Sequence, residues 1–280
     1  MNDRLIKKLR NFIDDPIFFL LRQVYRLIII YPFQLFVSLY FYFIDTFKAG
    51  NDEPNSDVCF IITSVVYPEM NKKIEYGSGR SIFNPPEREQ QTLTTINSIK
   101  TKVPSAKIVL IEGGKKDWMD ERTKKLVDQY IFLGNNRLVR FACDSKLKSF
   151  GEAIMLIVAF GRINFYSKLN FKISGRYYLN DNFNLSNWHS EGFTVHYVKD
   201  NDKYANIDSQ YILTRIYSFS YEMINYWKSA VVKGLPYILI GYPIENTLAK
   251  FFPHKFVNFV KVVGIAGIAG SVASKVYVED

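Results

Sequence analysis

The chain has 280 residues, of which 48% are hydrophobic and 16% aromatic, and its formal net charge is +9. This length and apolar content allow one large α/β domain together with an appendage. Two cysteines and three histidines exclude a zinc finger, and no DNA- or RNA-binding motif is present, so we expect no nucleic-acid partner. The basic excess predicts a different anionic partner, such as a nucleotide phosphate or a membrane surface.

Residues 1–54 differ from the rest of the chain and predict a basic, aromatic helical arm followed by a linker. Basic residues dominate the first part of the arm, and the run from Leu27 to Ile44 carries no charge. That run is at the lower limit of a membrane-spanning helix, which needs about 20 apolar residues. Pro32 and Gln34 interrupt its apolar character, which argues against a simple span.

We therefore expect residues 1–50 to lie on a membrane surface, with basic side chains toward lipid phosphates and aromatic ones toward acyl chains. This would place the protein peripherally on the cytoplasmic face. A single membrane-spanning helix and a buried pair of helices remain alternatives at this point.

Residues 55–280 predict one α/β domain. Val58–Val65 is a continuous apolar run, as expected of a central strand that is buried on both faces. A loop over 67–86 follows, then an amphipathic helix over Glu87–Lys102 and a strand over Lys107–Glu112. This strand–helix–strand order predicts parallel strands joined by a right-handed crossover.

The next predicted elements are a helix over Trp118–Tyr130, a strand over Val139–Cys143 and a helix over Ser149–Phe160. Ser149 and Glu152 have the spacing of a capping box, which would give Glu152 a purely structural role. A strand over 164–173 then enters the stretch that begins at Ser174. The remaining predicted strands and helices are Phe193–Tyr197, Ile212–Tyr217, Ser220–Val232, Ile244–Phe252, 256–268 and 275–278. Together they predict a mixed central sheet.

Three stretches carry a resemblance to a known family. They are Pro86–Ile99, Asp144–Leu156 and Phe171–Tyr177, and the similarity extends over about 57–265. In this order they resemble the GT-A nucleotide-sugar glycosyltransferases, and in particular the small surface-polysaccharide glycosyltransferases of bacteria and large DNA viruses. The resemblance implies a GT-A-like, Rossmann-like fold and transfer of a sugar from a nucleotide-sugar donor.

The resemblance also implies an Asp-x-Asp signature that holds a divalent metal where the third stretch leaves its strand. Here the corresponding positions are Ser174 and Arg176, on either side of Gly175. We therefore assign no metal ligands, although Asp181 could supply one and Mg²⁺ or Mn²⁺ remains open as a cofactor. Arg176 could bind the donor diphosphate and neutralise charge on the departing group.

The remaining donor site is implied by the resemblance to involve the end of the first strand, the loop after it and the helices that follow. The donor-binding candidates are Thr63, Ser64, Tyr67, Arg88, Lys148, Ser174, Gly175 and Arg176. Arg88 has an equally acceptable reading as a solvated residue in the first turns of its helix, paired with a neighbouring glutamate.

An inverting transfer needs a base that deprotonates the acceptor hydroxyl. Glu245 resembles the acidic residue that opens a late helix in inverting GT-A enzymes, but it would also suit the positive end of the helix dipole. Asp181 and Glu191 are rival carboxylates. Trp188, His189 and Glu191 are the candidates for acceptor binding.

The leading functional hypothesis is a glycosyltransferase of surface-polysaccharide synthesis that uses a glycan or lipid-linked acceptor and depends weakly, if at all, on metal. A catalytically silent nucleotide- or glycan-binding scaffold at the membrane is the alternative. A nucleotidyltransferase would need a glycine-rich basic loop after the first strand, which Gly77–Arg80 matches only in part.

Overall fold

The computed structural model describes residues 16–47, 54, 56–68, 83–199, 210–269 and 276–279. They belong to two compact units, residues 1–49 and 50–280. The first basic residues of the arm, most of the linker and the loop at 77–80 lie outside the described residues.

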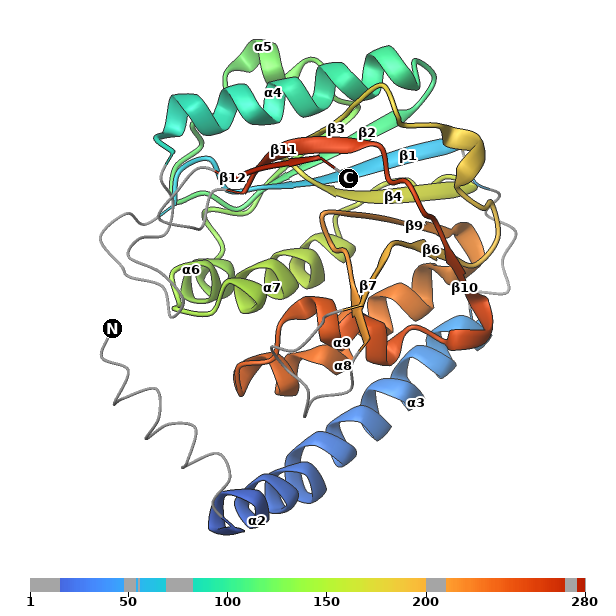
Figure 1. The fold of residues 1–280 in the computed structure, drawn as a ribbon. Coiled ribbons are helices and arrows are strands. Elements are labelled where there is room, and N and C mark those ends of the chain that lie inside the picture. The colour runs from blue at the N-terminus through green and yellow to red at the C-terminus, as the bar shows by residue number, and fades with distance from the viewer. Residues whose placement is uncertain are drawn as a thin grey trace. The chain divides into compact units, whose positions relative to one another are not determined.

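The N-terminal unit is helical over its described length. It comprises α2 (Pro16–Tyr25), the π-helical turn η1 (Arg26–Ile30) and α3 (Tyr31–Phe47) (Figure 1). Pro32 cannot donate the hydrogen bond of a continuous α-helix, and the wider turn η1 lies directly before it. Among residues 16–47, as in the rest of the described chain, no helix is both long and apolar enough to cross a bilayer.

A seven-stranded sheet forms the centre of residues 50–280, in the order β10-β6-β9-β4-β1-β2-β3. Only β9 runs antiparallel to its neighbours, so the sheet is mixed, as the sequence predicts. The strands are β1 (Val58–Ser64), β2 (Lys107–Glu112), β3 (Gln129–Phe132), β4 (Leu169–Ser174), β6 (Phe193–Val195), β9 (Ile216–Ser220) and β10 (Val257–Phe259).

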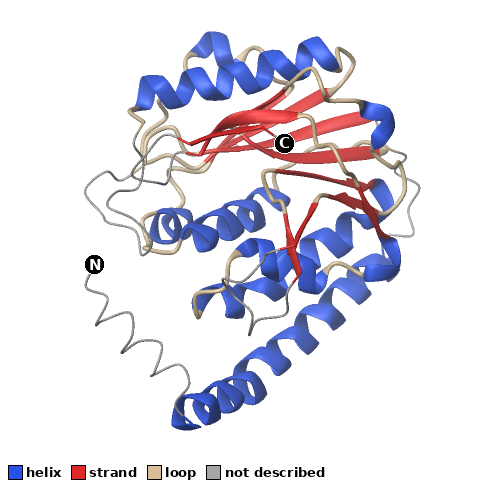
Figure 2. Cartoon of the chain, viewed as in Figure 1, coloured by secondary structure: helices blue, strands red, loops and turns tan. Residues whose placement is uncertain are grey.

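Helices cover both faces of this sheet (Figure 2). One face packs against α4 (Pro85–Lys102) and a three-stranded sheet of β5 (Tyr177–Leu179), β11 (Ile265–Ala269) and β12 (Val276–Glu279). The other face packs against α6 (Arg137–Cys143), α7 (Lys148–Phe160), α8 (Ile224–Leu239) and α9 (Ile244–Phe251). The shorter elements are α5 (Glu121–Lys124), η2 (Leu185–Asn187), β7 (Tyr197–Lys199), β8 (Gln210–Ile212), η3 (Tyr221–Met223) and η4 (His254–Phe256).

Strand β1 is the middle of the core. Its side chains alternate between the two faces, with Cys59 and Ile61 in one apolar cluster and Phe60 and Ile62 in the other. This explains the continuous apolar run in the sequence, because both faces of the strand are covered. The structure confirms the predicted first strand, the helix after it and the second strand.

The predicted helix over Trp118–Tyr130 is wrong. Only α5 is helical there, and Gln129–Phe132 forms β3 instead, paired in parallel with β2. Asp128 fixes the start of β3, since its carboxylate accepts hydrogen bonds from Lys107 Nζ at 2.8 Å and Ile108 N at 2.9 Å. Pairing with the edge of β2 overrides the weak helical pattern.

The predicted strand over Val139–Cys143 is also wrong, because these residues belong to α6. The side chain of Asn136 accepts hydrogen bonds from Leu138 N at 3.0 Å and Val139 N at 3.1 Å, which starts a helix. Val139 and Ala142 then share the buried side of that helix. Further along, the run predicted as one strand over Ile212–Tyr217 is divided between β8 and β9.

The sheet order places a topological switch point between β1 and β4. Strand β1 continues to β2 on one side, whereas β4 returns to the other side of β1 after the helices of the opposite face. The strand order thus changes direction along the sheet between β1 and β4, and such a switch point at the carboxyl ends of parallel strands is where open α/β sheets bind ligands.

Candidate functional site

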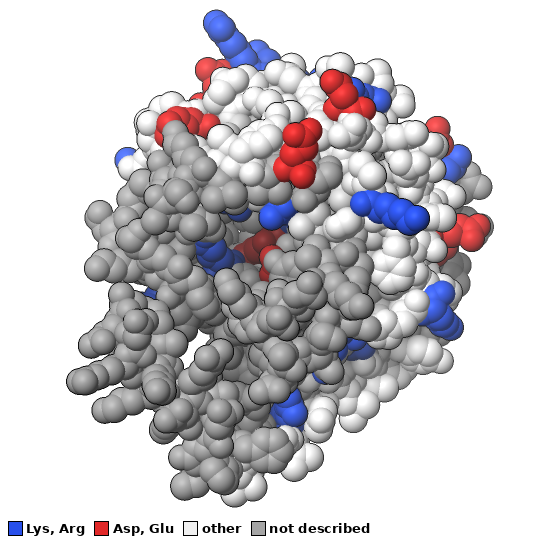
Figure 3. Space-filling view, viewed as in Figure 1, with Lys and Arg blue, Asp and Glu red and all other residues white. Residues whose placement is uncertain are grey.

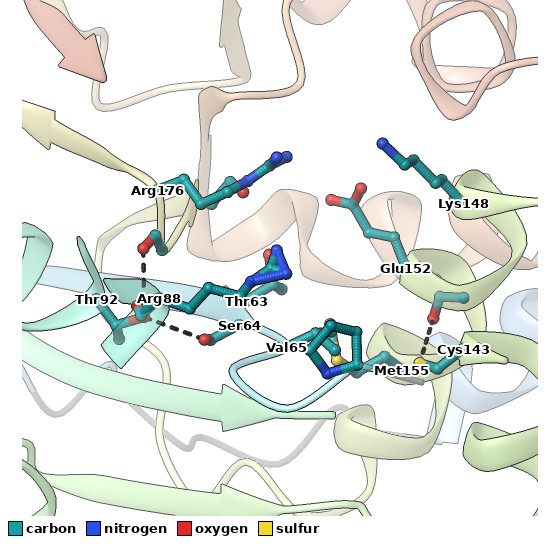
Figure 4. Close-up of a pocket in the computed structure, with 14 residues that line it drawn as sticks. Thr63, Ser64, Val65, Arg88, Thr92, Cys143, Lys148, Glu152, Met155 and Arg176 are labelled. Atoms are coloured by element: carbon teal, nitrogen blue, oxygen red, sulfur yellow. Dashed lines mark hydrogen bonds between the residues drawn. The ribbon is translucent and has the colours of Figure 1, made fainter. Parts of the chain in front are cut away.

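A pocket of about 880 Å³, including its open mouth, lies at the carboxyl ends of β1 and β4 (Figure 4). Side chains from the ends of these strands, from α4 and from α7 meet in it. The described residues that line it are Thr63, Ser64, Val65, Pro68, Arg88, Thr92, Cys143, Lys148, Gly151, Glu152, Met155, Ser174, Gly175 and Arg176. The structure thus brings together all but one of the predicted donor-binding residues.

The floor of the pocket is made where β1, β4 and α4 approach one another. Gly175 N donates to Thr63 O at 2.9 Å, and the Thr92 hydroxyl lies 3.1 Å from Ser64 Oγ and 3.3 Å from Gly175 O. A Cβ on Gly175 would lie 3.1 Å from Thr92 Oγ1, so a side chain here would press α4 away from the sheet. The glycine allows close contact between the strand exit and the helix.

Arg88 enters the pocket from the first turns of α4. Asn84 caps this helix, since its side chain accepts from Glu87 N at 2.9 Å and the Glu87 carboxylate accepts from Asn84 N at 2.8 Å. Burial, followed by the nearby charge of Arg176, lowers the pKa of Arg88 to about 9. Arg88 is still a cation at neutral pH, so two like charges face one pocket.

Arg176 reaches the same pocket from the exit of β4, two residues after Ser174 (Figure 4). Both arginines are half-buried. Two guanidinium groups at close range repel each other, and an anion bound between them would relieve that repulsion. The pair therefore favours a ligand with phosphate or another compact negative charge.

The carboxylate of Glu112, at the end of β2, partly offsets the charge of Arg88. It is fully buried and accepts hydrogen bonds from Val66 N at 2.9 Å and Gly114 N at 2.6 Å. Burial raises its pKa, while these hydrogen bonds and the charge of Arg88 act in the opposite direction. Glu112 thus joins the segment that follows β1 to the segment that follows β2.

The opposite wall of the pocket belongs to α7, which contributes Lys148 and Glu152 (Figure 4). Glu152 is not part of a capping box, because α7 begins at Lys148 and its N-cap, Leu147, makes no side-chain bond. Its carboxylate instead contacts the ammonium group of Lys172 in β4. Glu152 was not predicted to lie in the pocket, because its spacing from Ser149 matched a capping box.

Glu245 lies in the first turn of α9, outside the residues that line the pocket. Its Oε1 accepts a hydrogen bond from the Thr214 hydroxyl at 3.0 Å. Burial raises its pKa, the charge of Glu152 adds to this effect, and the charge of Lys172 opposes it. Glu245 therefore belongs to the same charged cluster as Glu152, behind the pocket wall.

Asp181 is remote from the pocket. Its fully exposed carboxylate pairs with Lys102 at 2.7 Å, at the last residue of α4. Arg88 lies near the beginning of that helix, about 20 Å away along an axis that rises 1.5 Å per residue. The structure thus separates Asp181 from Arg176, although they are close in sequence.

The predicted acceptor residues are also outside the pocket. His189 and Glu191 are exposed and lie just before β6, which runs parallel to β4, so they are at the amino ends of these strands. Trp188 is 4% exposed and packs edge-on against Phe171, with ring centroids 5.0 Å apart. Its faces are covered by core side chains rather than open to a sugar.

Tyr67 is the one predicted donor-binding residue that does not line the pocket. Its ring lies 5.6 Å from that of Trp118, and Lys116 Nζ lies 5.5 Å from its centre. Tyr67 O accepts a hydrogen bond from Lys115 N at 2.8 Å. In this position Tyr67 joins the segment after β1 to the segment after β2.

The described side chains of the pocket do not fit a divalent cation. Mg²⁺ and Mn²⁺ bind through carboxylate oxygens, whereas Glu152 is the one carboxylate among the described lining residues and is paired with Lys172. Three cationic side chains, those of Arg88, Lys148 and Arg176, line the same pocket. No group of three or more acidic, histidine or cysteine side chains within the described ranges could hold a metal.

Figure 3 shows acidic and basic side chains close together on this face of the molecule. The charges in the described pocket are divided between its walls, with the arginines of α4 and β4 on one side and Glu152 and Lys148 on the other (Figure 4). A ligand that carries a negative group at one end and neutral hydrogen-bonding groups at the other would match this division.

No family model matches the sequence, and no curated protein shows significant similarity to it. Several solved structures align with this chain. The galactosyltransferase LgtC, in complex with donor and acceptor sugar analogues, aligns over 73% of this chain and 73% of its own, with 9% identity and a TM-score of 0.43. An active-site mutant of LgtC aligns over 73% and 72%, with 10% identity and a TM-score of 0.45. The bifunctional glycosyltransferase WbbM, in its apo form, aligns over 76% of this chain and 40% of its own, with 14% identity and a TM-score of 0.42.

Proposed function

We propose that this protein transfers a sugar from a nucleotide-sugar donor to a hydroxyl group of a glycan or lipid-linked acceptor. The observation that carries the proposal is the convergence of Arg88 and Arg176 in a pocket at the switch point between β1 and β4. Nucleotide phosphates bind at such crevices in α/β sheets. Two guanidinium groups suit a diphosphate, which offers them several charged oxygens.

In the proposed reaction the acceptor oxygen bonds to the anomeric carbon while the bond from that carbon to the diphosphate breaks. The electron pair of the broken bond remains on the diphosphate, and Arg176 and Arg88 stabilise the added negative charge. This is the work that a divalent metal would otherwise do, so we propose that transfer needs little or no metal.

Glu245 remains our candidate for the base that accepts the proton of the acceptor hydroxyl. Its raised pKa suits proton acceptance better than that of an ordinary surface carboxylate. Glu245 does not line the pocket, so in this proposal the acceptor hydroxyl would have to approach it from beside α9.

We further propose that the protein works on surface-polysaccharide precursors at the cytoplasmic face of a membrane, to which residues 1–50 attach it. The support is the exposed apolar surface of the described arm, where Leu35, Phe36, Tyr42 and Phe43 are each more than half exposed. Together with the basic residues in the arm sequence, such a helix is suited to the interface of a bilayer.

A nucleotide-binding scaffold without catalytic activity is the second candidate. It is favoured by one observation, the presence of Ser174 and Arg176 where the resemblance leads one to expect metal-binding aspartates. It differs from the enzyme in a single respect, since it would bind a nucleotide sugar and leave it intact.

The test is a thermal-shift panel of nucleoside diphosphates and their sugars, with and without EDTA. We expect at least one nucleotide to raise the melting temperature by about 5 °C or more at saturating concentration, in the presence of EDTA. If no nucleotide in the panel raises the melting temperature, both candidates are overturned. Stabilisation that disappears with EDTA would overturn the metal-independent site.

A further inference from the structure

Lys172 is a buried cation in the middle of the central sheet. It belongs to β4, between β1 and β9, and is 1% exposed. Its ammonium group contacts Glu152 Oε1, donates to Thr214 O at 3.1 Å and lies 6.0 Å from the centre of the Tyr217 ring. A charge is kept at such a depth only when it is paired and hydrogen-bonded, so Lys172 depends on Glu152.

Glu152 is not buried to the same extent. Its side chain is 28% exposed and lines the pocket, where its carboxylate is directed into the open space across from Arg176 (Figure 4). The buried lysine holds one carboxylate oxygen, Oε1. An ammonium group at this position fixes the direction of the carboxylate.

The charge of Glu152 restricts what can bind beside it. A phosphate would be repelled by the carboxylate, so a diphosphate belongs at the arginines on the other wall. A carboxylate accepts hydrogen bonds well from hydroxyl groups, and Lys148, one helical turn earlier in α7, can donate to their oxygens. This end of the pocket is therefore suited to a neutral polyhydroxyl group.

We propose that Glu152 binds hydroxyl groups of the sugar that is transferred, and that Lys172 is the positioning residue that aims Glu152 at them. This rests on the proposed function, since it divides one nucleotide sugar between two walls, with the diphosphate at Arg88 and Arg176 and the sugar at Glu152. The substrate class that follows is a donor sugar with free hydroxyl groups on the ring face toward α7.

The charged cluster continues from Lys172 to α9. Thr214 accepts from Lys172 through its carbonyl oxygen and donates to Glu245 through its hydroxyl. The cluster therefore joins β4, α7 and α9, and loss of Lys172 removes the counter-charge from Glu152 and Glu245 together. A change at Lys172 alone should then alter both stability and sugar binding.

The experiment separates these two effects in the full-length chain. Titration calorimetry compares UDP with UDP-glucose, GDP with GDP-mannose and dTDP with dTDP-glucose, for the wild type, Glu152→Gln, Lys172→Met and the double variant. The double variant removes the buried pair as a unit, so it should regain melting temperature relative to either single variant. The exposed pair Asp57–Lys168 provides the matched control, Asp57→Asn with Lys168→Met.

We expect the wild type to bind at least one nucleotide sugar more tightly than the corresponding diphosphate. The double variant should bind that nucleotide sugar about tenfold to hundredfold more weakly, while its affinity for the diphosphate changes by less than about twofold. A double variant that keeps wild-type affinity for the nucleotide sugar would show that the pair is only structural, and would overturn the inference. If the wild type binds none of the six nucleotides, the proposed function itself fails.

Discussion

Arg88 and Arg176 together give the pocket its character. Each could be an ordinary surface arginine if considered alone, but they come from different elements and face the same space. Their mutual repulsion lowers the pKa of Arg88, second only to the effect of burial. The two guanidinium groups therefore repel each other in the pocket. A diphosphate bound between them would offset this repulsion by pairing with both.

Arg176→Ala should weaken binding of the nucleoside diphosphate by about tenfold to hundredfold, because a charge-assisted and potentially bidentate contact is lost. Arg88→Ala should have an effect of similar size. Isothermal titration at low and moderate salt measures both. The control is Arg162→Ala, since Arg162 is exposed and follows the far end of α7. Equal affinities for Arg176→Ala and Arg162→Ala would rule out the proposed diphosphate site.

Glu245 should make stability depend on pH. Burial raises its pKa in the folded state, so the folded protein holds this proton more readily than the unfolded chain. The resulting stabilisation is complete below the ordinary pKa of glutamate and is lost as pH rises through the folded-state pKa. Glu245→Gln should therefore gain melting temperature relative to the wild type as pH rises from 4 to 7, by on the order of 2 °C. A difference in melting temperature between Glu245→Gln and the wild type that stays constant from pH 4 to 7 would contradict a raised pKa for Glu245.

Sequence reasoning finds side chains better when they follow strands than when they depend on tertiary contacts. Thr63, Ser64, Ser174 and Arg176 could be named because the resemblance to GT-A enzymes implies a donor site at the strand ends, and the carboxyl ends of parallel strands meet at one edge of the sheet. Glu152 could not be predicted as a pocket residue, because its spacing from Ser149 suggested a local cap. Lys172 was the sequence signal for Glu152. A lysine inside an apolar strand needs an acidic partner nearby when it is buried.

At the scale of elements, the N-terminus of α4 positions one wall of the pocket. The reciprocal bonds between Asn84 and Glu87 fix the first turn, and Arg88 is the next residue. The Thr95 hydroxyl of α4 also donates a hydrogen bond to Tyr177 O at 2.8 Å, which joins α4 to β5. The direction of Arg88 thus depends on how α4 begins.

Asn84→Ala should lower the free energy of unfolding by about 1 kcal/mol, because the backbone N–H of Glu87 loses its acceptor. Chemical denaturation measures this loss. Diphosphate affinity should fall by a small factor as well, since Arg88 is held less firmly. Asn84→Asp, which keeps an acceptor at the cap, should restore both properties. If Asn84→Ala changes neither the free energy of unfolding nor the diphosphate affinity, the Asn84 cap does not position Arg88.

Elements with strong local signals could be predicted closely, and elements defined by neighbours could not. Strands β1 and β2 and helix α4 have clear apolar patterns and clear end signals. Strand β3 forms because it pairs with the edge of β2, a cause that lies outside the segment. Helix α6 does carry a local signal in its cap, Asn136, but the largely apolar run Val139–Cys143 outweighed it in the prediction. Neither cause is visible in the average hydrophobicity of the segment.

At the scale of the whole molecule, the chain combines a compact α/β unit with a separate helical arm. The described part of the arm exposes many apolar side chains, which is unusual for a surface that meets only water. The α/β unit has its own core on both faces of the sheet. Membrane attachment and catalysis should therefore be separable by mutation.

Phe36→Glu with Phe43→Glu should weaken sedimentation of the full chain with vesicles that contain anionic lipid, by tenfold or more, since two exposed rings on α3 are lost. Affinity for the nucleoside diphosphate should not change. Phe259→Glu, at an exposed aromatic residue of the α/β unit, is the control. Vesicle binding that is unaffected by the double change would refute the proposed attachment.

The most direct test of the central claim is release of nucleoside diphosphate from a nucleotide sugar, measured with EDTA present. The donor is the one that stabilises the protein most in the thermal-shift panel. We expect slow release by the wild type and by Arg162→Ala, and release reduced by about a hundredfold in Arg176→Ala, which lacks the guanidinium that stabilises the leaving group. Release that proceeds equally in Arg176→Ala, or that requires a divalent metal, would contradict catalysis by the arginine pair.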